Sequence, residues 1–267
     1  MSKTIALLSS ALVCLLSGST ASLLAQVAQG TPSRPDFTGV YYTFNPNAAA
    51  RGGAAAPPAV AGARGNAAAP PRPVAVIDGR EGRPATAPKL TAEYMAKWEI
   101  LRKSRMSGSS EFDPNARCLS AGMPSMMGMG YGMEIQQTKD KITIYGELND
   151  VYRRIFLDGR KPSQKTLDDP TYAGYSMGHW EGNTLVVDTV ALRDDTLLDT
   201  FSPHSDQMTV QERIRFTSPG VLEDRITTTD PKALLEPHVA VRTYRKAAPP
   251  NDELREFSCA EGLASTK

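Results

Sequence analysis

Residues 174–178 fit the Gly-x-Ser-x-Gly pattern that surrounds the nucleophile of α/β-hydrolases. The serine is Ser176, and His204 follows it in the chain, as a general base would. Three candidate acids lie between them: Asp194, Asp195 and Asp199. A nucleophile elbow requires a buried strand before the serine and a helix after it, whereas residues 167–171 are typical of a turn. We therefore expect Gly174 and Gly178 to flank a bulge or loop, with Ser176 a loop or strand-edge residue whose hydroxyl bonds nearby backbone.

A carboxylate interrupts an apolar strand face at Glu212. It alternates with Val210, Ile214 and Phe216, so it should face the core. A buried carboxylate must be paired with a cation or have a raised pKa. The candidate partners are Arg153, Arg154, Arg213 and Arg225. We favour a structural ion pair, and the alternative is that Glu212 forms the polar floor of a ligand cavity.

His204 lies just before this strand, in the segment His204-Ser205-Asp206. An imidazole near a buried carboxylate suits general acid–base catalysis, because its pKa lies near neutrality. One alternative function is therefore a periplasmic enzyme, a hydrolase or a lyase/isomerase, that uses His204 and Glu212. A cavity on which Tyr175, His204 and Glu212 converge would favour it, although a solvated loop histidine is the commoner case.

Half of the 10 methionines lie within residues 123–133. They are Met123, Met126, Met127, Met129 and Met133. Thioethers suit Cu(I), which makes a copper-handling protein a second alternative. The glycines between them indicate a loop, where methionine could simply cover an apolar cavity mouth. The 3 histidines, His179, His204 and His238, show no local zinc-binding spacing, so we assign no metal and no cofactor.

Trp180 precedes a turn at Glu181-Gly182-Asn183. A tryptophan in this position commonly closes one end of a barrel, and we favour that core role over ligand stacking. The candidate ligand-binding residues are Tyr175, Trp180, His204 and Glu212.

The first 25 residues have the pattern of an export signal. Lys3 supplies a positive start, an apolar run extends to Leu16, and small residues at Ser19–Ala21 or Ala25 offer cleavage points. An uncleaved membrane anchor is the alternative, but Ser17–Thr20 interrupts the apolar run. We expect a periplasmic or secreted protein with no stable membrane insertion after cleavage.

Composition divides the rest of the chain. Residues 46–88 are dominated by Ala, Gly and Pro and have little to bury, which predicts a disordered linker or insertion. Residues 35–45 and 89–262 are then expected to form a single β-rich domain. The net charge is +1, which argues against a nucleic-acid partner and leaves a small molecule as the expected one.

Short runs of alternating polar and apolar residues dominate after Cys118. Runs near 134–137, 142–145, 151–157, 184–190, 210–216, 222–226 and 238–245 predict strands joined by tight turns. A further strand is expected at 35–42. One helix should begin after Thr91 and carry Trp98 onto the main body. The pattern predicts a mainly β fold, an antiparallel barrel or sandwich with one N-terminal helix.

The segment 174–189, Gly-Tyr-Ser-Met-Gly-His-Trp-Glu-Gly-Asn-Thr-Leu-Val-Val-Asp-Thr, resembles the signature of a widespread family of secreted bacterial proteins of unknown function. That family typically reads Gly-His-Ser-Ile-Gly-Arg-Trp-Glu-Gly-Asp-Thr-Leu-Val-Val-Asp-Thr. This sequence departs from it at Tyr175 and His179. Residues 35–41, with a glycine followed by aromatics, are also similar to the first strand of lipocalin-like barrels. The resemblances imply export and β-structure, and no activity.

An exported β-barrel with half-polar strands favours ligand binding over catalysis and copper handling. We expect the protein to bind a small, apolar or amphipathic molecule in an internal cavity.

Cys118 and Cys259 are the two cysteines that remain in the exported chain after signal cleavage. An even number of cysteines in an oxidising compartment predicts one disulfide. A tryptic digest made without reductant should then contain the Cys118 and Cys259 peptides as one linked mass. Alkylation of both residues as free thiols in protein taken from the periplasm would contradict this.

Overall fold

The computed structural model describes residues 34–44, 86–109, 111, 114, 117–199, 201–255 and 257. The predicted export segment and residues 46–85 of the predicted linker lie outside them. The described residues from Pro35 onward belong to one compact unit.

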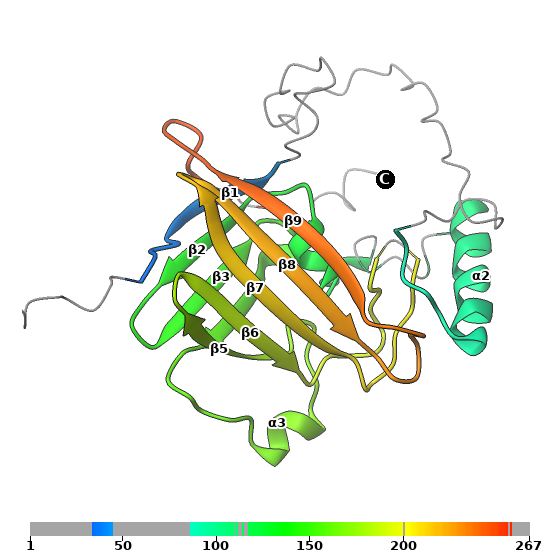
Figure 1. Cartoon of the computed structure of the whole chain (residues 1–267). Helices are drawn as coiled ribbons and strands as arrows, with labels where there is room; N and C mark the ends of the chain where they lie inside the picture. Colours follow the sequence, from blue (N-terminus) through cyan, green and yellow to red (C-terminus); the bar gives the residue numbers. More distant parts are fainter. Residues whose placement is uncertain are drawn as a thin grey trace, which may run out of the picture. The chain divides into compact units, whose positions relative to one another are not determined.

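The strands close into a single nine-stranded barrel, with neighbours in chain order (Figure 1). They are β1 (Gly39–Thr43), β2 (Met133–Gln137), β3 (Lys141–Gly146), β4 (Val151–Phe156), β5 (Tyr175–Glu181), β6 (Thr184–Val190), β7 (Thr209–Ser218), β8 (Val221–Thr229) and β9 (His238–Lys246). β9 pairs with β1, which leaves the barrel without an edge strand. The predicted mainly β barrel is confirmed, and the sandwich alternative is wrong.

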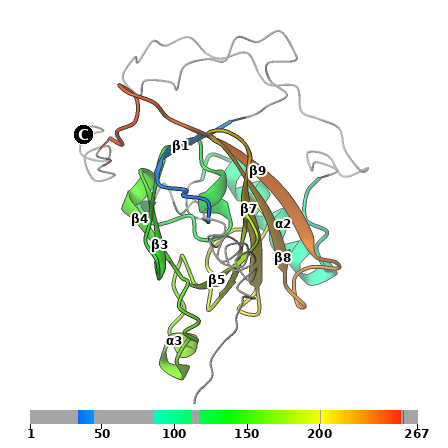
Figure 2. The ribbon, with the colours of Figure 1, turned by 60° about the vertical axis from the view of Figure 1, so that its left-hand side comes forward.

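One neighbouring pair departs from the predicted antiparallel arrangement. β4 and β5 run parallel and pair only at Ile155↔Ser176 and Phe156↔Met177. Strand direction cannot alternate all the way round a closed barrel with an odd number of strands, so one parallel pair is unavoidable. Residues 157–174 make the required crossover, and the helix α3 (Gln164–Asp168) within them projects away from the barrel (Figure 2).

The strand–turn pattern expected from the sequence is otherwise present. β7 shows it most clearly, since Val210, Glu212 and Ile214 are buried while the residues between them are exposed. Tight turns join β2 to β3, β5 to β6 and β7 to β8, where the sequence predicts them. Alternation of this kind points one face of each strand into the barrel.

The helix α2 (Ala92–Met106) contributes Tyr94, Met95 and Trp98 to the hydrophobic core. It starts directly after Thr91, but the side chain of Thr91 does not cap it. The Thr91 hydroxyl instead donates to the carbonyl of Lys232 at 2.9 Å, which ties the start of the helix to the loop before β9. Neither described α-helix has the length and apolar character needed to cross a membrane.

Side chains fill the two ends of the barrel. Phe37, just before β1, packs its ring against Trp180 and Phe216 with centroid distances of 5.3 and 5.1 Å. Trp180 thus has the packing role that the sequence favours. At the far end of β1, the short 3-10 helix η2 (Ser125–Gly128) buries Met127, whose carbonyl accepts a 2.6 Å hydrogen bond from the Tyr244 hydroxyl.

Candidate functional site

A buried arginine occupies the centre of the barrel. Arg153 extends from β4 across two strands and contacts Glu212 on β7 through both terminal nitrogens, with Nη1 donating to Oε1 at 2.8 Å and Nη2 donating to Oε2. Its Nε and Nη2 also donate to Ser176 at 3.2 Å, and Nη2 donates to Thr189 at 3.1 Å. Both side chains of the ion pair are fully buried. Of the candidate partners of Glu212, the structure selects Arg153.

A second carboxyl lies close to this pair. Asp224 on β8 is completely buried and lies beside Glu212, and its two oxygens accept no hydrogen bond from a described residue. Burial and the neighbouring Glu212 carboxylate raise the pKa of Asp224 well above its ordinary value, although Arg153 opposes the shift. Burial raises the pKa of the Tyr244 hydroxyl, and the neighbouring Asp224 and Glu212 carboxyls raise it further.

These charges balance only if one proton is retained. Burial alone would lower the pKa of Arg153, but the Glu212 carboxylate outweighs that effect and keeps the guanidinium charged. One cation and two carboxyls form a neutral group when the carboxyls hold one proton between them. We therefore assign the retained proton to Asp224, the carboxyl whose pKa is raised.

Buried side chains occupy the barrel centre, where the sequence predicts a ligand cavity. Among the described residues they are Arg153, Glu212, Asp224 and the surrounding apolar side chains. The pocket at the mouth, beside Tyr244, has a volume of about 30 Å³, which is room for one water molecule. Glu212 forms a buried ion pair, the role that the sequence favours for it.

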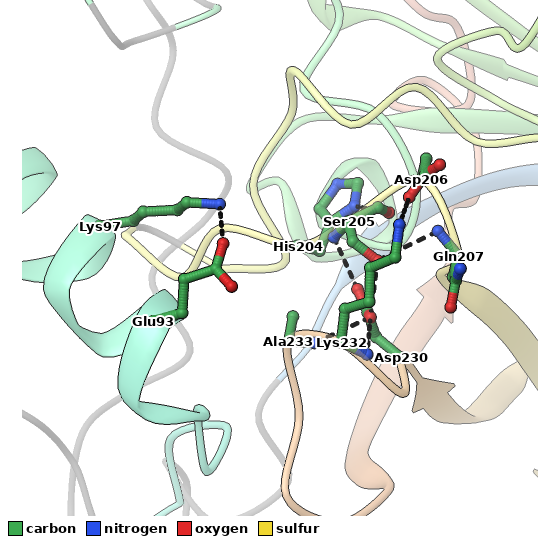
Figure 3. A network of polar contacts seen from close by, with 9 residues as sticks. All are labelled: Glu93, Lys97, His204, Ser205, Asp206, Gln207, Asp230, Lys232 and Ala233. Atoms are coloured by element: carbon green, nitrogen blue, oxygen red, sulfur yellow. Dashed lines mark hydrogen bonds and ion pairs between the residues drawn. The ribbon is translucent and has the colours of Figure 1, made fainter.

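His204 is part of a separate network (Figure 3). Its Nε2 lies 2.8 Å from the Thr196 hydroxyl and its Nδ1 lies 3.1 Å from the Ser205 carbonyl. Burial lowers the pKa of His204, so the ring is neutral at pH 7 and both nitrogens are engaged. Asp230 holds the same loop by accepting from the Ser205 amide at 2.6 Å and its hydroxyl at 2.8 Å. The hydrogen-bond partners of His204 and Glu212 share no residue, so the structure gives no support to the predicted acid–base pair.

Ser176 lies inside β5, which corrects the prediction of a loop or bulge at residues 174–178. The hydroxyl is fully buried and lies 2.8 Å from that of Thr189. The chain continues as a strand into a hairpin with β6, so the strand–turn–helix of a nucleophile elbow is not formed.

The larger hollow near the predicted residues lies on the barrel wall, where β4 and β5 separate. We call it the wall groove; its volume is about 560 Å³. Its aromatic residues are Tyr152, Phe156, Tyr172 and Tyr175, and it also includes Arg154, Asp150 and Asp169. The Phe156 and Tyr175 rings lie 5.1 Å apart. Tyr175 is the one predicted ligand-binding residue that lines it.

Unusual backbone conformations concentrate at the wall groove. Four described non-glycine residues have positive φ: Cys118 (56°), Asn149 (59°), Asp150 (48°) and Ala191 (55°). All of them line the groove. This conformation costs roughly 1–2 kcal/mol for an L-residue, less for Asn or Asp, and such residues cluster at functional sites. Cys259 lies outside the described residues, so its disulfide with Cys118 stays a prediction.

Within the described residues, no group of three or more His, Cys, Asp or Glu side chains could hold a metal ion. His179 is instead an exposed neighbour of Glu181 on β5, at 3.3 Å.

The sequence left two kinds of residue unassigned. Asp224 alternates with the buried Leu222 and Ile226, and that is the same signal that identified Glu212. Tyr152 faces outward from β4, as does Arg154, which the sequence offered only as a partner of Glu212, and the divergence of β4 from β5 makes both part of a groove.

Fold and groove together define a closed, mainly antiparallel β-barrel with an open pocket on its wall. No protein-family model and no curated protein matches the chain. Similar solved structures include the fluorescent protein UnaG, as the wild type and as a point mutant. Each has a TM-score of 0.29 and 19% sequence identity, and the match covers 51% of this chain and 88% of the UnaG chain.

Glu212→Ala should destabilise the protein strongly, because it leaves the Arg153 guanidinium buried without its ion-pair partner. The expected loss is about 3–5 kcal/mol of unfolding free energy, measured by urea denaturation. The control is Glu223→Ala, which removes a 3.0 Å ion pair with Arg215 on the surface of the same sheet and should cost less than about 1 kcal/mol. Equal losses in the two variants would contradict a buried ion pair.

The raised pKa of Asp224 predicts a pH dependence. Above about pH 4 the unfolded chain releases a proton that the folded chain retains. The contribution of Asp224 to stability is therefore full below that pH and falls as the pH rises toward the folded-state pKa, with a limiting slope of about 1.4 kcal/mol per unit. Asp224→Asn should remove this slope, so the variant should gain stability relative to the wild type from pH 4 to 8.

His204 contributes a slope of the opposite sign below about pH 6.5, because burial lowers its pKa. This contribution is the same in the wild type and in Asp224→Asn, so it cancels when their unfolding free energies are subtracted. Parallel stability–pH curves for the two proteins would show that Asp224 is ionised in the folded state.

Proposed function

We propose that this protein is an exported β-barrel that binds a small amphipathic molecule in the wall groove. The observation that carries the proposal is the coincidence of this pocket with all four described non-glycine residues of positive φ. Backbone in such conformations must be held by its surroundings, and the groove is where the structure concentrates it.

The groove has the size and surface of a small-molecule site. Its volume of about 560 Å³ falls within the range of roughly 300–1,000 Å³ typical of ligand pockets. Tyr152 is 60% exposed, a large aromatic surface that is in contact with water when the groove is empty. Covering such a ring with a flat apolar ligand would be favourable.

Arg154 adds a charge to this aromatic surface. It lies two residues from Tyr152 on the outer face of β4, and its side chain makes no hydrogen bond or ion pair with another described residue. A guanidinium at the rim would pair with an acidic group on the ligand. The groove thus favours a molecule with a planar apolar body and an anionic substituent.

Export is supported by the sequence of residues 1–25, an apolar run with a positive start and small residues after it. An exported chain would also keep the proposed Cys118–Cys259 disulfide oxidised, which would fix one side of the wall groove.

The test uses anilinonaphthalene sulfonate (ANS), a fluorescent probe with fused aromatic rings and one anionic group. The full chain should bind ANS saturably at one site. Tyr152→Ala and Arg154→Gln should each weaken binding about tenfold, which corresponds to about 1.4 kcal/mol. Val241→Ala is the control, because Val241 is an exposed apolar residue (48%) on β9 outside the groove, and it should bind ANS like the wild type.

Two results would contradict the proposal. One is ANS binding that is unaffected by either groove variant. The other is loss of binding in Ile100→Ala, since Ile100 on α2 lines a different hollow of about 360 Å³.

A further inference from the structure

We propose that the methionine-lined cavity at the barrel mouth is a binding site for Cu(I). Four methionines line this one pocket: Met126, Met127, Met129 and Met133. They come from η2, from the loop after it and from the first residue of β2, so the fold brings thioethers from three successive segments to the same pocket. This inference is independent of the proposed function, because the cavity and the wall groove share only Val151 among the residues that line them.

The size of the cavity suits an ion. A volume of about 30 Å³ holds one water-sized occupant. Its other lining residues include Ile144, Leu148 and Val151, which limit the approach of water. Neutral thioethers in apolar surroundings bind soft ions such as Cu(I) and offer little to Mg²⁺ or Ca²⁺, which require oxygen ligands.

The charge around the cavity fits a monovalent cation. Glu147 is the one acidic residue that lines it, and its Oε2 accepts a 3.2 Å hydrogen bond from the Gly132 amide. One carboxylate balances one positive charge, whereas a divalent ion would leave a charge uncompensated in apolar surroundings.

Packing explains only some of these methionines. Met127 and Met133 are 3% and 8% exposed and belong to the hydrophobic core. Met126 and Met129 are only half-buried at the rim, where leucine would cover the core as well. Tyr131, 44% exposed, lies beside them at the solvent side, which leaves a route for an ion to enter.

The experiment titrates the full chain with Ag(I), which has the same d¹⁰ configuration as Cu(I) but does not cycle between oxidation states. Free thiols are first alkylated with iodoacetamide, and binding is measured by calorimetry and native mass spectrometry. The wild type should bind one Ag(I). The double variant Met126→Leu/Met129→Leu should bind at least about tenfold more weakly. Met106→Leu, which changes a 70% exposed methionine on α2, should bind like the wild type.

A second measurement does not depend on variants. Bound Ag(I) should protect Met126 and Met129 from conversion to the sulfoxide by hydrogen peroxide, read by peptide mass spectrometry, while Met106 stays reactive. Absence of a one-to-one complex, equal affinity in the double variant, loss of binding after alkylation, or equal oxidation with and without Ag(I) would each overturn the proposal.

Discussion

The guanidinium of Arg153 has no access to water, and the interior of this barrel depends on that constraint. Its charge must be balanced at the centre of an apolar core, and Glu212 does so through two contacts. The hydroxyls of Ser176 on β5 and Thr189 on β6 accept further hydrogen bonds from Nε and Nη2. Because Asp224 adds a second buried carboxyl, the core is neutral only with a bound proton. The barrel centre is thus polar and yet fully occupied.

The candidate binding site lies on the barrel wall, because side chains occupy the interior. The strand topology produces the wall groove. Nine strands cannot all be antiparallel in a closed barrel, so β4 and β5 pair in parallel over two residue pairs and then separate. The crossover 157–174 must leave the barrel and return, and its last residues line one side of the wall groove. At Gly174, which has a φ of 66°, a Cβ would lie 2.7 Å from the Val190 carbonyl, so the approach to β5 requires glycine.

Local patterns in the sequence predicted most strands, because alternation and turn residues are short-range signals. They also placed Glu212 on the buried face, yet they could not choose Arg153 among four arginines, since the pairing crosses from β4 to β7. Alternation with Leu222 and Ile226 marked Asp224 equally well, and the proton it holds follows only from its burial beside Glu212. Strand direction has no local signature, which is why the parallel pair and the wall groove were not predicted.

Because the buried core is neutral only with a bound proton, the folded protein should retain one on Asp224. Carbon-13 NMR of the side-chain carboxyls, with Asp224→Asn to assign the signal, tests this directly. One carboxyl should remain protonated at pH 7 in the wild type and be missing from the variant. A spectrum in which every carboxyl is ionised at pH 7 would contradict the retained proton.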